Sequence, residues 1–169
     1  MTKRRPLIIG FGNPLREDDG LGWRAAELLG QQLPAGEAEI IQCHQLTPEL
    51  AASFKDASVV VFLDAATDAE PGAVSSVPVR AESTVVWSHY LSPGQLLGLS
   101  EQLGRPAPPA FLIRGGIQRM DLGEKLTGLG EHAALEMADL ARALLRAPDG
   151  SAKNRPDSDA SEPGRNDRM

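Results

Sequence analysis

The apolar run at residues 58–63, SVVVFL, constrains the fold more than any other segment of the chain. Its three consecutive valines favour an extended strand, because β-branched side chains fit a pleated sheet. Beyond its first residue the run has no polar position on either face, so both faces have to be covered. We therefore expect a central strand in a sheet that carries helices on both faces.

Strand-like and helix-like segments alternate along the rest of the chain. Short apolar runs predict strands at residues 6–9, 39–43, 58–63 and 110–113. Residues 72–80 predict an edge strand, because they contain Pro78, and this strand can be antiparallel to its neighbour. Spaced apolar positions predict helices at residues 20–32, 47–55, 92–103 and 130–145. This order predicts an α/β fold, a three-layer sandwich with a mostly parallel twisted sheet of about five strands and helices on both faces.

Local signals predict where these elements begin and end. Asp18 or Asp19 is available as the N-cap of the first helix, and the Thr47 hydroxyl precedes a proline at the start of the second. Gly115 and Gly116 should stop the last strand. We expect a single domain at residues 1–146 and a disordered polar tail at 147–169, whose composition cannot bury enough apolar area to offset its ordering entropy.

Charge and cysteine content exclude several classes of protein. A formal net charge of −6 and a pI of about 5.1 argue against nucleic acid as the main partner. No apolar run has the length of a membrane span and the N-terminus does not read as a signal peptide, so we expect a cytoplasmic protein. The single cysteine, Cys43, excludes an internal disulfide and a multi-cysteine zinc site, and we expect it to be a buried apolar filler.

Polar residues follow the predicted strands at positions where open α/β sheets bind ligands. Asp18 and Asp19 come after the first strand, Asp64 ends the central strand, and His89 precedes a predicted helix. We expect one or two of the carboxylates and the imidazole to converge on one crevice. Such a set suits Ni²⁺, Zn²⁺ or a similar ion, and it equally suits general acid–base chemistry. The plain structural alternatives are a helix cap, a loop carboxylate and a backbone-bonded histidine.

A nucleotide site is disfavoured although two glycines follow the first strand. A dinucleotide fingerprint would need a third glycine where Leu15 stands, and an acidic residue after the second strand, which ends at Cys43. Cys43 and His44 cannot form a nucleophilic pair, because neighbouring residues on a strand point to opposite faces. His132 is expected on the surface.

Four segments in order resemble the hydrogenase maturation peptidases, which trim the C-terminal extension of the large subunit of nickel–iron hydrogenases. The first is the turn at residues 10–22, GFGNPLREDDGLG; the others are residues 63–65 (LDA), 88–89 (SH) and 116–118 (GIQ). The resemblance spans about residues 6 to 146. It implies that Asp19, Asp64 and His89 contact nickel already inserted in the precursor, so that nickel comes with the substrate and no cofactor or nucleotide is stored.

The implied partner is the hydrogenase large-subunit precursor, and the implied activity is an endopeptidase of aspartic type or one that depends on nickel. Asp19 and Asp64 can act as a carboxylate pair that activates water, or the nickel can orient the water; the sequence does not choose. The alternatives are an aspartate-type peptidase with another substrate on the same fold, as in the spore germination proteases, and a non-catalytic metal-binding assembly chaperone.

Overall fold

A computed structural model describes residues 3–83 and 90–147. In this part of the chain one five-stranded sheet has the order β2-β1-β3-β5-β4. Its strands are β1 (Arg5–Phe11), β2 (Glu39–Cys43), β3 (Ala57–Ala66), β4 (Val74–Pro78) and β5 (Ala110–Gly116). All neighbours pair in parallel except β4, which runs antiparallel to β5 at the sheet edge. The predicted α/β class and mostly parallel sheet are confirmed, and the Pro78 segment is the antiparallel edge strand.

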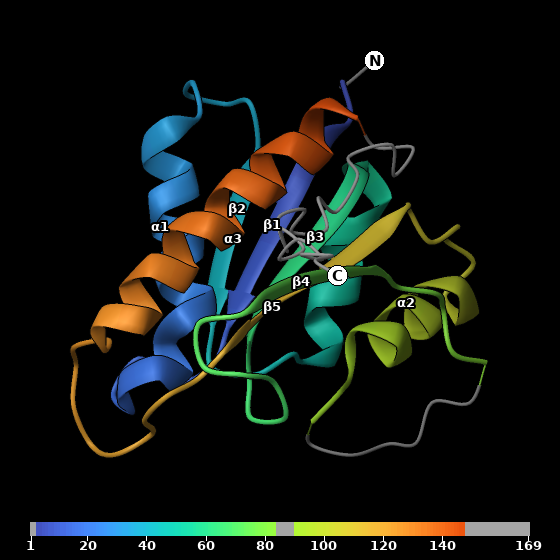
Figure 1. The fold of residues 1–169 in the computed structure, drawn as a ribbon. Coiled ribbons are helices and arrows are strands. Elements are labelled where there is room, and N and C mark those ends of the chain that lie inside the picture. Colours follow the sequence, from blue (N-terminus) through green and yellow to red (C-terminus); the bar gives the residue numbers. More distant parts are fainter. Residues whose placement is uncertain (1–2, 84–89, 148–169) are drawn as a thin grey trace, which may run out of the picture.

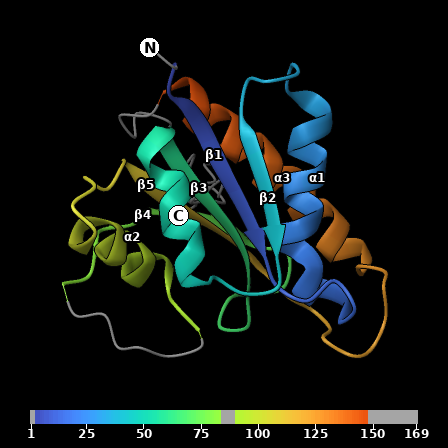
Figure 2. The same ribbon diagram turned by 180° about the vertical axis from the view of Figure 1, so that it is seen from behind.

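Helices cover both faces of the sheet (Figures 1 and 2). One layer holds α1 (Leu21–Gln32) and α3 (Gly128–Arg146), and the other holds the 3₁₀ helix η2 (Pro48–Asp56) and α2 (Pro93–Gln102). Side chains of β3 alternate between two cores: Val61 and Leu63 pack toward α1 and α3, while Val60 and Phe62 pack toward η2 and α2. Within residues 3–83 and 90–147, no helix combines the length and apolar character that a membrane crossing needs.

Two predicted helix caps are wrong. A short 3₁₀ turn, η1 (Glu17–Gly20), leads directly into α1, whose N-cap is Gly20, and neither Asp18 nor Asp19 caps this helix. Their carboxylates accept other hydrogen bonds, described below. The Thr47 hydroxyl does not cap the following helix either; it hydrogen-bonds Glu49 and lowers the pKa of that carboxyl.

Glycines set how closely the layers approach one another. A side chain at Gly22 would collide with the backbone oxygens of Leu63 and Phe11, so this glycine lets α1 sit directly against β1 and β3. The last strand ends at Gly116, so it includes both glycines that were predicted to stop it and is three residues longer than predicted; Gly116 pairs with Ala66. The missing side chain at Gly116 makes room for the backbone oxygen of Glu70.

Candidate active site

The carboxyl ends of β1, β3 and β5 bring three loops to one edge of the sheet, the lower edge in Figure 2. These loops are the turn from β1 to α1, the segment after β3, and the segment from β5 to α3. Parallel neighbours end at the same edge, so residues 100 positions apart in the chain become neighbours there, as the hydrogen bond between Gln118 and Asp18 illustrates.

Residues of the turn after β1 contact both the side chain and the backbone of Asp19. The Asp19 carboxylate accepts a hydrogen bond from the backbone N–H of Asn13 at 3.1 Å. Gly12 has a φ of 135°, and a side chain there would collide with the backbone oxygen of Asp19. Because L-residues with side chains rarely adopt such a φ, the turn needs glycine at this position. These contacts fix the half-buried Asp19 at the edge of the sheet.

Asp64 lies within β3, where it is the register partner of Arg114 on β5. Burial raises the pKa of Asp64 to about 7, and the negative charge of Asp19 adds to the increase. A hydrogen bond from the backbone N–H of Ala65, at 2.8 Å, and the positive charge of Arg114 act in the opposite direction without cancelling it. Asp19 and Asp64 are therefore close enough to interact, and Asp64 can gain or lose a proton near neutral pH.

Asp18 is the one carboxylate among the described residues that is completely buried. Its oxygens accept hydrogen bonds from the backbone N–H groups of Gln118 (2.9 Å), Arg119 (3.3 Å) and Thr127 (2.8 Å), and also from the Thr127 hydroxyl. Burial raises the pKa of Asp18, but these hydrogen bonds outweigh it and leave the pKa below its ordinary value. Thr127 in turn caps α3 by accepting from the Gly130 N–H. Asp18 thus fastens the β5–α3 loop to the first turn.

Two of the three predicted site residues, Asp19 and Asp64, lie at this edge. The third, His89, is outside the described residues, so the predicted triad stays a prediction. Within the described part of the chain, no three histidine, cysteine, aspartate or glutamate side chains are grouped closely enough to hold a metal ion. Carboxylate oxygens such as those of Asp19 and Asp64 are suitable ligands for a divalent metal ion.

Two features of this edge were not predicted, and one prediction about it is only partly right. Arg114 beside Asp64 could have been found only from the pairing of β3 with β5, which the sequence does not specify. His44, at the end of β2, contacts the Trp23 ring edge-on with ring centroids 5.7 Å apart. Cys43, predicted to be buried, is half-buried, and burial raises the pKa of its thiol. A raised thiol pKa disfavours the nucleophilic thiolate.

Comparisons with known structures identify proteins of the same fold. The hydrogenase maturating endopeptidase HybD from Escherichia coli has a TM-score of 0.69 at 22% identity, covering 86% of this chain and 94% of that one. The NiFe hydrogenase maturation protease HycI from Thermococcus kodakarensis has a TM-score of 0.66 at 27% identity, with the same coverage. A hydrogenase 2 maturation peptidase from a Thaumarchaeota archaeon has a TM-score of 0.64 at 24% identity, covering 84% and 98%.

No protein-family model and no curated protein sequence matches the chain. The likeness is thus one of structure, and it extends over most of the chain at low sequence identity. These structures confirm the resemblance to the hydrogenase maturation peptidases that the sequence segments indicated. The chain has the α/β fold of these proteins.

Proposed function

Because the chain has the fold of the hydrogenase maturation endopeptidases, we propose that it is a peptidase that removes the C-terminal extension of a nickel–iron hydrogenase large-subunit precursor after nickel insertion. In this proposal Asp19, Asp64 and His89 recognise the nickel, which belongs to the substrate. Cleavage then follows only when the metal is in place.

The observation that carries the proposal is the pair of carboxylates at the ends of two adjacent parallel strands. Asp19 is held by the turn after β1, and Asp64, on β3, has a pKa of about 7. The pKa of Asp64 rises partly because of the Asp19 charge, which is the behaviour of two carboxylates that share one site. This arrangement supports hydrolytic chemistry at neutral pH, because a general base works best with a pKa near the working pH.

The pair has two uses in the proposed reaction. Asp19 and Asp64 offer oxygens to the nickel of the precursor, together with the His89 imidazole. The proton held by Asp64 near neutral pH can be exchanged with the attacking water or with the leaving amine. Nickel carried by the substrate can orient or polarise the water.

The test is to incubate the protein with nickel-loaded and nickel-free large-subunit precursor and to follow the loss of the C-terminal extension by mass spectrometry. The proposal expects cleavage of the loaded form only. The Asp64→Asn variant, which keeps the shape of the side chain but loses its charge and its titrating proton, is expected to leave the loaded precursor uncut. The Asp56→Asn variant is the matched control and should cleave normally, because Asp56 is the last residue of η2, next to the amino end of β3 and far from the carboxyl end that carries Asp64.

Each possible result decides something different. Equal cleavage of both precursor forms would contradict nickel recognition and favour an aspartate-type peptidase. Binding of the loaded precursor without cleavage by the wild-type protein would contradict the peptidase and favour an assembly chaperone. If the wild-type protein neither cleaves nor binds the precursor, the hydrogenase large subunit is not its partner.

A further inference from the structure

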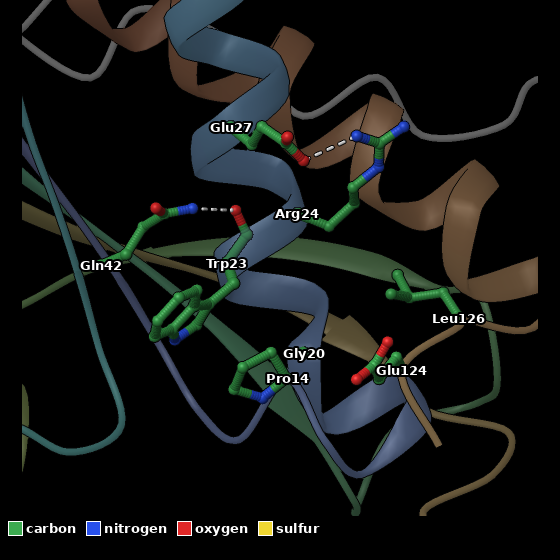
Figure 3. A pocket seen from close by; sticks show the side chains of 8 residues that line it. All are labelled: Pro14, Gly20, Trp23, Arg24, Glu27, Gln42, Glu124 and Leu126. Carbon is green, nitrogen blue, oxygen red and sulfur yellow. Dashed lines mark hydrogen bonds and ion pairs between the residues drawn. The ribbon is translucent and has the colours of Figure 1, made fainter.

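A pocket of about 350 Å³ lies beside the candidate active site, on the side of α1 (Figure 3). Its walls include Pro14, Trp23, Arg24, Glu27, Glu124 and Leu126. Gly20, the residue after Asp19, also lines it. The volume is at the lower end of the range for small-molecule sites, about 300–1,000 Å³. The pocket is therefore suited to one long side chain, next to the turn that carries Asp19.

The charges around the pocket are predominantly negative. Arg24 is shared by two carboxylates, Glu27 at 2.7 Å and Glu131 at 3.1 Å. Glu124 lies on the opposite wall and, within residues 3–83 and 90–147, forms no ion pair. The lining holds two carboxylates, Glu27 and Glu124, against one guanidinium, Arg24, whose charge is also shared with Glu131 from outside the pocket, so negative charge is in excess. A cationic side chain entering the pocket would find Glu124 available.

The apolar part of the pocket suits the carbon chain of such a side chain. Pro14 and Leu126 provide apolar walls, and Trp23 provides an aromatic ring. The Trp23 indole N–H donates to the backbone oxygen of Cys43 at 2.9 Å, so the ring is fixed by the end of β2. Lysine and arginine bury their carbon stems against such surfaces, and their cationic heads are attracted to tryptophan rings.

The wall that carries Glu124 is fastened at both ends. On one side, the Gly123 carbonyl accepts a hydrogen bond from the Glu17 N–H at 2.8 Å, and the Gly123 N–H donates to Leu15 at 2.9 Å. On the other side, the buried Asp18 carboxylate holds Thr127. The pocket is consequently formed before any partner arrives, which reduces the entropic cost of binding.

We infer that this pocket binds an arginine or lysine side chain of the protein partner, and that this contact positions the partner beside Asp19. The inference rests on the proposed function in taking the partner to be the hydrogenase large-subunit precursor. Binding of a cationic side chain by the pocket can, however, be tested without any precursor. The strongest argument is charge complementarity, because the acidic excess sits against an apolar and aromatic wall.

The binding test uses the fluorescence of Trp23. The chain has two tryptophans, so a Trp87→Phe background makes Trp23 the sole reporter. Titration with N-acetyl-arginine amide is compared with N-acetyl-citrulline amide, which has nearly the same shape and no charge. We expect a saturable change with the arginine compound that Glu124→Gln weakens up to about five-fold, the size of an exposed ion pair. Glu136→Gln, an exposed carboxylate outside the pocket, is the control and should change nothing.

Equal binding of the arginine and citrulline compounds, or equal binding by the Glu124→Gln and Glu136→Gln variants, would overturn the inference. With precursor, Glu124→Gln should raise KM and leave kcat unchanged, and an unchanged KM would show that the partner does not use the pocket. Selective arginine binding without any precursor cleavage would instead refute the proposed function and leave the cation pocket standing. Circular dichroism of each variant checks that it is folded.

Discussion

Replacing Asp64 by asparagine should stabilise the protein at neutral pH while it removes the proposed activity. Burial and the Asp19 charge raise the pKa of Asp64 from 3.8 to about 7, so the folded protein holds a proton that the unfolded chain has already lost. Above that pKa, folding has to bury a charged carboxylate. Asparagine has no such charge, and its amide oxygen can still accept the Ala65 N–H.

The size of the effect follows from the shift in pKa. About three units at about 1.4 kcal/mol each give an upper limit of about 4 kcal/mol. Asp64 is not fully enclosed, and solvent screening reduces the expected gain to about 1–2 kcal/mol. The free-energy cost of burying the charged Asp64 carboxylate is absent below about pH 4, grows as the pH rises, and reaches its full size above about pH 7. The gain in the variant should follow the same curve.

The assay is urea unfolding of the wild-type and variant proteins at several pH values on both sides of the Asp64 pKa. The free energy of unfolding of the variant should exceed that of the wild type at high pH, and the two should converge toward acidic pH. Asp56→Asn, in which the replaced side chain is 65% exposed, should change stability by less than about 0.5 kcal/mol. A variant that is less stable than the wild type above pH 7 would refute the argument, because the charged carboxylate would then be stabilised by its surroundings.

Three further predictions concern other parts of the site. Asp18→Ala should lower the free energy of unfolding, measured in urea, by roughly 3 kcal/mol, because the buried N–H groups and the Thr127 hydroxyl lose their acceptor. A loss below about 1 kcal/mol would show that water replaces the carboxylate. Gly22→Ala should lower the melting temperature by several degrees, because the added methyl group would clash with the backbone oxygen of Leu63. An unchanged melting temperature would mean that α1 can move away from the sheet without cost. His89→Ala should abolish processing of nickel-loaded precursor with the melting temperature nearly unchanged; an unfolded variant would make His89 a structural residue.

The local pattern of the sequence was sufficient for the fold class. Apolar runs such as residues 58–63 have no polar face, and helices in α/β proteins alternate with such runs, so the layers follow from short-range periodicity. The same pattern indicated Asp19 and Asp64 as residues at the ends of strands. It could not indicate that β1 and β3 are neighbours with β5 beyond them, because strand order depends on long-range pairing.

The roles of the two adjacent aspartates show where local reasoning fails. Both were predicted as possible helix caps, because an aspartate before a helix usually bonds the first free N–H groups. In the folded chain Asp18 instead bonds Thr127, which is 109 residues away, and Asp19 bonds the turn that precedes it. A buried carboxylate takes the donors that the tertiary structure brings to it, wherever they lie in the chain.

The sequence by itself thus determined the α/β class, the edge strand and the positions of the two carboxylates along the chain. Only the tertiary structure decided that Asp64 has a pKa of about 7, that Asp18 holds the β5–α3 loop, and that Glu124 and Trp23 line the same pocket. The physical reason is that periodicity is a property of neighbouring residues, whereas burial, charge proximity and buried hydrogen bonds depend on segments that meet only when the sheet has formed.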